Sequence, residues 1–182
     1  MIVTFGATFF GVVASFLLWF GAQWWIKRQR DKKAVRAMMG EIQEEIQLNI
    51  ALLDQLAKTT PKMLEEGNVP VYIPNRMNLA VYNYVVSTGE IRLIDDIRKQ
   101  RLIRCAAIAC ETFNKFIDNT EVLLAIFLLR RDGLVWSKYR LKGLIETADD
   151  KRKYLEDILN KLQQSELQKE DKERRKDRTG KS

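Results

Sequence analysis

The stretch KAVRAMMGEIQEEIQLNIALLDQLAK, residues 33–58, decides the fold, because its apolar residues recur in alternating steps of four and three. This spacing is typical of a helix that buries one stripe in a bundle or coiled coil. The stripe consists of Val35, Met39, Ile42, Ile46, Leu53 and Leu56, with Asn49 at the remaining position. An asparagine there can fix an oligomer's register or bond to another helix of its own chain, and we favour the bond within the chain.

The residues before this helix predict a transmembrane helix. Residues 1–26 carry no charged side chain. As a helix, residues 2–26 would extend over about 37 Å, more than the ~30 Å hydrocarbon core of a bilayer. The basic residues follow this segment instead of preceding it, so we expect a retained anchor and not a cleaved signal peptide.

A basic cluster follows directly, and residues 27–36 are predicted to form a juxtamembrane collar. Lysines and arginines resist translocation, so the pattern predicts a single-pass plasma-membrane protein with its N-terminus outside and its C-terminal domain cytosolic. The expected partners of this segment are the lipid bilayer and anionic lipid headgroups. The predicted membrane-interface residues are Trp24, Trp25, Lys27, Arg28, Arg30, Lys32 and Lys33.

Small residues repeat at intervals of four in the apolar segment, at Ala7, Gly11 and Ser15. Such a face lets two helices approach closely, so these residues and Asn49 are candidate contacts of a homo-oligomer. Small residues are common in membrane helices for other reasons as well, and we favour that simpler reading.

Further helices are expected downstream, so the fold class predicted is all-α, with the transmembrane helix continuing into a cytosolic antiparallel helical bundle with coiled-coil-like seams. A short turn should begin at Thr60, and residues 68–74 should be extended or looped. The helices are expected over residues 76–86, over 94–131 with a break near 118–120, and from 136 onward. The domains are 1–26, the transmembrane helix; 27–36, the collar; 37–164, the bundle; and 165–182, a charged disordered tail.

A charge-free run of eight residues, 122–129, is too short to cross a membrane. We expect it to be a fully buried part of a central helix. The tail contains KERRKDR at residues 172–178, but it lacks interleaved aromatic residues, so we expect no nucleic-acid binding.

Catalytic and cofactor signatures are missing from the sequence. It contains no histidine, no phosphate-binding glycine loop and no paired C-x-x-C motif. Cys105 and Cys110 point about 140° apart on a helix, and we expect both as small apolar residues of a reduced interior. Carboxylates that could hold a metal are read instead as a solvated helix face or a helix amino end: Glu41, Glu44, Glu45, Asp95 and Asp96. No catalytic, cofactor or metal residue is predicted.

One loose pattern joins E-x-x-x-N at Glu45 and Asn49, then Leu52 and Leu53, then Tyr82, then Ser87-Thr88-Gly89-Glu90 leading into IRLIDD. Over residues 41–120 this order resembles uncharacterised prokaryotic and phage-associated single-span membrane proteins. The resemblance implies a helical domain near a membrane and no known activity.

These observations predict a membrane-tethered protein-interaction module, not an enzyme, that binds an unknown protein partner. One alternative is a structural homo-oligomer assembled through the span and the first cytosolic helix. A membrane-bound enzyme of unrecognised type is the other alternative, because catalytic groups need not be adjacent in sequence.

Overall fold

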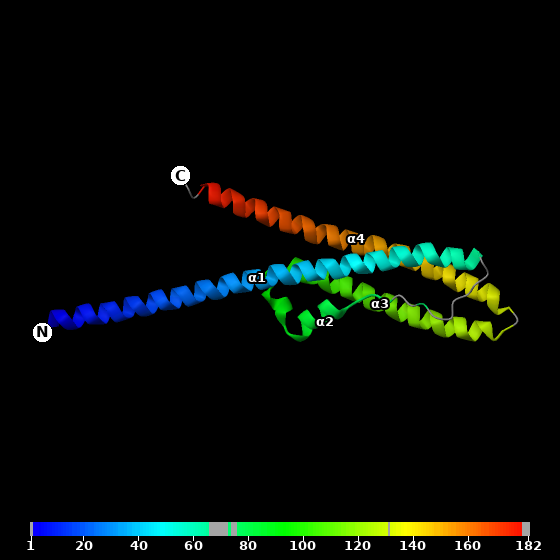
Figure 1. The fold of residues 1–182 in the computed structure, drawn as a ribbon, viewed down its shortest axis with the longest axis horizontal. Coiled ribbons are helices and arrows are strands. Elements are labelled where there is room, and N and C mark those ends of the chain that lie inside the picture. Colours follow the sequence, from blue (N-terminus) through cyan, green and yellow to red (C-terminus); the bar gives the residue numbers. More distant parts are fainter. Residues whose placement is uncertain (1, 66–72, 74–75, 131, 180–182) are drawn as a thin grey trace. The chain divides into compact units, whose positions relative to one another are not determined.

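The computed structural model describes the backbone of residues 2–65, 73, 76–130 and 132–179, and the side chains of 15–62, 64–65, 73, 76–130 and 132–168. It contains the helices α1 (Ile2–Glu65), α2 (Ala80–Ser87), α3 (Ile97–Leu128) and α4 (Gly133–Thr179), and the 3-10 turn η1 (Glu90–Leu93) (Figure 1). These residues include no strand. The all-α prediction is confirmed.

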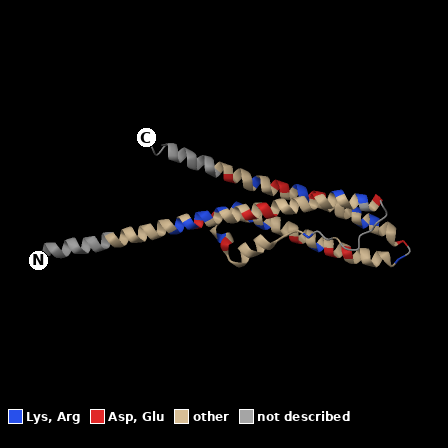
Figure 2. Ribbon diagram, in the orientation of Figure 1, with Lys and Arg blue, Asp and Glu red and all other residues tan. Residues whose placement is uncertain are grey.

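The chain divides into two compact units, Met1–Gly40 and Glu41–Ser182, and α1 contributes to both. In the first unit the large apolar side chains between Ser15 and Ile26 are exposed. The predicted collar, residues 27–36, belongs to the same helix, and Figure 2 shows its basic residues as a blue band on α1. The boundary between the two units falls after Gly40.

The predicted localisation is wrong on the part of the chain that the structure describes. In those residues no helix contains an apolar stretch long enough to cross a membrane. An 18-residue window that starts at Ser15 reaches Lys32, and it includes four basic residues and Asp31. Charged side chains at that density are too costly in hydrocarbon. The earlier part of the predicted span, residues 1–14, lies outside the residues whose side chains are described.

The Glu41–Ser182 unit is a bundle of three long helices, formed by the second part of α1, α3 and α4. In Figure 1, α3 and α4 run in opposite directions, as predicted, whereas α1 and α3 run in the same direction. The buried apolar side chains come from all three helices: Ile42, Ile46, Leu53 and Leu56 on α1; Ile103, Ala106, Cys110, Phe113, Ile117 and Leu124 on α3; Leu141, Leu144, Ala148, Leu155, Ile158 and Leu162 on α4. These four residues of the predicted stripe therefore form part of the core, and Met39 in the first unit is also buried, whereas Val35 is half-buried.

The end of α1 differs from the prediction, because the helix continues through Pro61 to Glu65 without the expected break at Thr60. Proline has no N–H to donate to the preceding turn. Hydroxyl groups bond to carbonyls in that turn: Thr59 Oγ1 donates to Gln55 O over 2.9 Å, and Thr60 Oγ1 to Leu56 O over 2.8 Å. Apart from Ile73, the expected loop at 68–74 lies outside the described residues.

The second predicted helix, 76–86, begins four residues later than expected, at Ala80. Residues 76–79 are not helical, because side chains of α1 and α3 bind their backbone groups, as described below. After α2 the chain turns at Gly89, whose φ of 76° lies in the left-handed region that glycine adopts without strain.

The third predicted helix, 94–131, is shorter than expected, because α3 covers Ile97–Leu128, and it has no break at 118–120. Asp96 is its N-cap, and the side chain accepts a hydrogen bond of 2.8 Å from the Arg98 N–H, which confirms the expected helix amino end there. The helix α4 then begins at Gly133, where a Cβ atom would overlap the Phe127 carbonyl oxygen, so the tight turn requires glycine.

The helix α4 continues to Thr179 and so includes most of the segment 165–182, for which a disordered tail was predicted. Its first residues contact the bundle. Gln43 Nε2 on α1 donates a hydrogen bond of 2.9 Å to the Glu166 carboxylate, which holds this part of α4 against α1. The side chains of 169–182 lie outside the described residues. Their exposure to solvent stays a prediction.

Candidate functional site

The residues predicted for a membrane interface lie on the first unit and are all exposed: Trp24, Trp25, Lys27, Arg28, Arg30, Lys32 and Lys33. The Arg28 guanidinium lies 5.1 Å from the centroid of the Trp24 ring, a cation–π contact. Their predicted role depended on a span that the described residues do not contain. They form an exposed basic and aromatic segment of α1.

The candidate oligomer contacts separate into three cases. Ala7 and Gly11 lie outside the residues whose side chains are described. Ser15 is exposed. Asn49 is 1% exposed, and its amide bonds within the chain, which confirms the explanation favoured from the sequence. It is therefore not available as a contact between copies.

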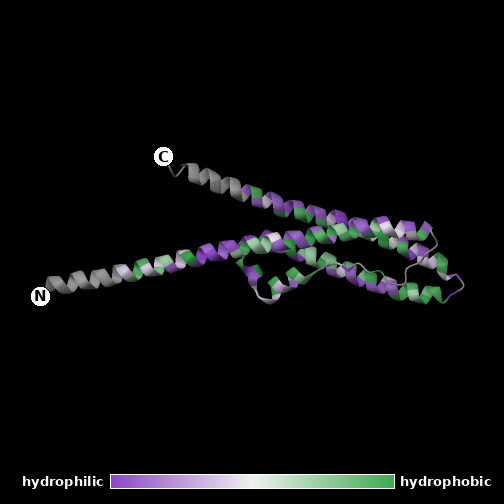
Figure 3. Ribbon diagram, viewed as in Figure 1, coloured by the Kyte–Doolittle hydropathy of each residue, from purple (hydrophilic) through white to green (hydrophobic). Residues whose placement is uncertain are grey.

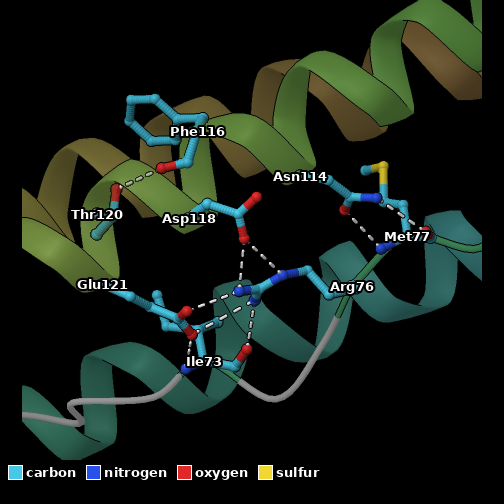
Figure 4. A network of polar contacts seen from close by, with 8 residues as sticks. All are labelled: Ile73, Arg76, Met77, Asn114, Phe116, Asp118, Thr120 and Glu121. Atoms are coloured by element: carbon cyan, nitrogen blue, oxygen red, sulfur yellow. Dashed lines mark hydrogen bonds and ion pairs between the residues drawn. The ribbon is translucent and has the colours of Figure 1, made fainter.

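A strap, defined as Ile73 and residues 76–79, runs between α1 and α3 ahead of α2. Asn49 Oδ1 on α1 accepts the Asn78 N–H over 2.7 Å, and Asn49 Nδ2 donates to the Asn78 carbonyl over 2.8 Å. Asn114 on α3 holds Met77 in the same way, over 2.8 and 3.0 Å (Figure 4). Two side-chain amides thus take the place of a neighbouring backbone strand, which is why these residues are not helical.

The outer part of the strap is held by charges. Figure 4 shows the Arg76 guanidinium between Asp118 and Glu121 of α3, at 2.8 and 2.7 Å from their carboxylate oxygens. Glu121 also accepts the Ile73 N–H, and Arg76 Nη1 donates to the Ile73 carbonyl over 2.7 Å. Because α3 supplies both carboxylates, this end of the strap is fixed to α3.

The amino end of α2 is capped by a residue distant in sequence. The Glu45 carboxylate on α1 accepts the N–H groups of Val81 and Tyr82, over 2.9 and 3.1 Å. The side chain of Leu79, the residue before the helix, makes no capping hydrogen bond. Glu45 supplies the acceptor instead, and its negative charge is favourable at the positive end of the helix dipole. The sequence placed Glu45 on a solvated face, but it is 6% exposed, so that expectation is wrong.

The ion pair of the strap makes stability depend on pH. Burial of Glu121 acts to raise the pKa of its carboxyl, but the hydrogen bonds from Arg76 and from the Ile73 N–H outweigh it and lower that pKa below 4.5. A carboxylate with a lowered folded pKa stabilises the fold above the unfolded pKa, and this stabilisation is lost as pH falls through the folded pKa.

We therefore expect Glu121→Gln to cost about 1–2 kcal/mol of unfolding free energy at pH 7 and clearly less at pH 3. Urea unfolding at the two pH values measures this difference. Glu111→Gln is the control, because Glu111 pairs with Lys115 on the same helix but is 58% exposed. Equal losses at pH 7 and pH 3 for Glu121→Gln would contradict the proposed linkage.

The two cysteines have different environments. Cys110 is buried, as predicted, whereas Cys105 is exposed, so the expected interior position of Cys105 is wrong. Burial, with the Glu45 carboxylate adding to it, raises the pKa of the Cys110 thiol to about 12. Asn49 Nδ2 lies 3.5 Å from its sulfur atom.

Alkylation of the native protein at pH 8 should therefore modify Cys105 at once and Cys110 only after unfolding, because Cys110 is buried and its thiol pKa lies far above that pH. Mass spectrometry after timed exposure to N-ethylmaleimide counts the modified thiols. In Cys105→Ser the fast modification should disappear. Rapid modification of both cysteines in the native chain would contradict the structure.

These polar contacts join side chains to backbone groups. The amides of Asn49 and Asn114 are bonded to backbone groups of the strap, and the carboxylate of Glu45 to backbone groups of α2, so they hold these two segments in place. In the described residues no group of three or more His, Cys, Asp or Glu side chains could hold a metal ion. The network is therefore a structural support of the bundle.

A different surface stands out where α3 ends and α4 begins. We call it the α3–α4 tip and define it by eight apolar side chains that are 45–89% exposed: Val122, Ile126, Leu128, Leu129, Leu134, Val135, Trp136 and Tyr139. Figure 3 shows apolar residues gathered on these parts of the two helices. The run 122–129 was expected to be fully buried, and this is wrong, because five of its eight residues are exposed. Only Leu124 in the run is fully buried, at 0% exposure.

Sequence reasoning missed the tip because an uncharged run was taken to mean burial. A second apolar group, at residues 134–136, follows the first after a short turn. Two apolar groups on either side of one hairpin turn were the available sign of an exposed surface. The inner faces of the two helices can bury only part of these groups.

Comparison of this chain with protein-family models, with curated proteins and with solved structures found no match. The fold itself defines the class of the protein: an all-α bundle with a strap that is bound by side chains. The resemblance stated above stays a prediction.

Proposed function

We propose that this chain is a protein-interaction module and that the α3–α4 tip is its binding surface. The observation that carries the proposal is the exposure of eight large apolar side chains at one end of the bundle. Exposed apolar clusters of this kind are typical of protein interaction sites. Covering a side chain of this size contributes about 1.5–3 kcal/mol when its burial is complete.

Contacts within the tip hold the Trp136 side chain, and a side chain that is already held loses less conformational freedom on binding. The Trp136 indole N–H donates to the Asp132 carboxylate over 2.9 Å, and the Trp136 and Phe127 ring centroids lie 6.4 Å apart. Gly133 permits the close turn between them.

Crosslinking in cells that naturally produce the chain tests the proposal. The double substitution Leu129→Ser and Val135→Ser should abolish the crosslinked complexes of the wild-type protein, identified by mass spectrometry. The matched control, Leu48→Ser with Ile108→Ser, removes two aliphatic side chains that are 54% and 60% exposed elsewhere on the bundle. Complexes that persist in the tip variant, or that vanish equally in the control, would refute this function.

A second candidate function, a structural homo-oligomer, is favoured by the first unit. Its side chains from Phe16 to Phe20 are 59–76% exposed, so every side of this part of α1 is apolar. Pairing with the same segment of a second copy would cover it. Crosslinking the purified chain at rising concentration should then yield dimers that Leu17→Lys with Phe20→Lys removes, and dimers that survive these substitutions would exclude this route.

A further inference from the structure

The α3–α4 tip is basic as well as apolar. Between Val122 and Ile145 the sequence contains five basic residues and a single acidic residue, Asp132. The Asp132 carboxylate is already bonded to the Trp136 indole. Basic side chains exposed to solvent there are Arg130, Lys138 and Lys142. A partner that covers the tip therefore meets a rim in which positive charges outnumber negative ones, with Glu146 one turn beyond Lys142 as the next acidic residue of α4.

Apolar and basic residues share one face of α4. Val135, Lys138, Tyr139 and Lys142 follow the three- and four-residue spacing that brings side chains onto one side of a helix. Tyr139 is 73% and Val135 70% exposed, and both lysines are exposed. This face alternates apolar contact area with positive charge along about two turns of helix.

The end of α3 presents a second stripe of the same spacing. It consists of Val122, Ile126 and Leu129, which are 60%, 45% and 89% exposed. No charged residue interrupts it. An extended apolar stripe on a helix is the kind of surface that receives the apolar face of another helix.

From this distribution we infer that the partner segment is an amphipathic helix with acidic residues beside its apolar face. This inference rests on the proposed function. The apolar residues of such a helix would cover the two stripes, and its carboxylates would pair with Lys138, Lys142 and Arg130 at the rim. Charge complementarity of this type selects partners and speeds association.

Two synthetic helical peptides test the inference. Both carry the same leucine face, but one has glutamates beside it and the other has lysines at the same positions. Fluorescence anisotropy with the full chain at ~0.1 M salt should show the glutamate peptide binding at least about tenfold more tightly, with a difference that shrinks as salt rises.

Charge reversal at the rim is the matching change in the protein. Lys138→Glu with Lys142→Glu should invert the preference between the peptides. The control is Arg101→Glu with Arg104→Glu, which reverses two exposed basic residues on α3 away from the tip and should leave the preference unchanged. Circular dichroism verifies that each variant is folded.

The outcomes separate this inference from the proposed function. If both peptides bind equally and Leu129→Ser with Val135→Ser abolishes both, the tip binds helices but the acidic partner is wrong. Failure of both peptides to bind overturns the inference, whereas the function itself is decided by crosslinking in cells. Stronger rim-dependent binding to phosphatidylglycerol vesicles or to single-stranded DNA than to the glutamate peptide would also overturn it.

Discussion

Replacing Asn49 by aspartate should destabilise the bundle by about 3 kcal/mol or more at pH 7, the largest effect expected for a change this small. The side chain is 1% exposed, and its Nδ2 now donates to the Asn78 carbonyl over 2.8 Å. A carboxylate at this position would face that carbonyl oxygen without a proton to donate, and Glu45 one turn away adds a second negative charge. Chemical denaturation monitored by circular dichroism measures the loss.

Acidification distinguishes this mechanism from a simple packing defect. Below pH 4 the new carboxyl group is protonated and can donate to Asn78, so part of the lost stability should return relative to wild type at the same pH. Asn119→Asp is the control, because Asn119 is exposed on α3 and should change stability by no more than about 0.5 kcal/mol. A native-like stability of Asn49→Asp at pH 7 would show that the strap does not depend on this amide.

Truncating Ile117 to alanine should cost about 2–5 kcal/mol, because its side chain is fully buried and the change leaves a cavity in the core. The same truncation of Ile108, on the same helix but 60% exposed, should cost less than about 0.5 kcal/mol. Thermal and urea unfolding of the two variants gives the comparison directly.

This pair also tests which face of α3 is covered. Residue type and helix are held constant, so the difference reflects burial and not helix propensity. If Ile108→Ala were as damaging as Ile117→Ala, a partner or a second copy would have to cover that face of α3 in solution. Equal and small effects would mean that α3 does not pack as described.

The repeat of apolar residues predicted the core of α1 well, because a stripe with this spacing can be satisfied only by burial along one side of a helix. Ile42, Ile46, Leu53 and Leu56 are all buried. The role of Asn49 within the chain was also predicted correctly. Asp96 was expected at a helix amino end, where it caps α3. In each case the deciding interaction is local or repeats along one helix.

Other predictions failed because the deciding partner lies far away in the sequence. Nothing next to residues 76–79 shows that Asn49 and Asn114 will bind their backbone and delay the start of α2. Glu45 looked like a solvated carboxylate, since its N–H partners at residues 81 and 82 are 36 and 37 positions away. The predicted membrane location also failed on the described residues, where charges from Lys27 onward interrupt the apolar stretch.

The sequence by itself determined that the chain is helical and which stripe of α1 is buried, because both follow from spacing along a single element. Only the tertiary structure decided that α1 and α3 run in the same direction, that the strap is bound by side-chain amides, and that most residues of the uncharged run 122–129 are exposed. An apolar composition indicates that burial is favourable, but the packing of α3 on α4 decides which of these residues are buried. Those left uncovered form the α3–α4 tip.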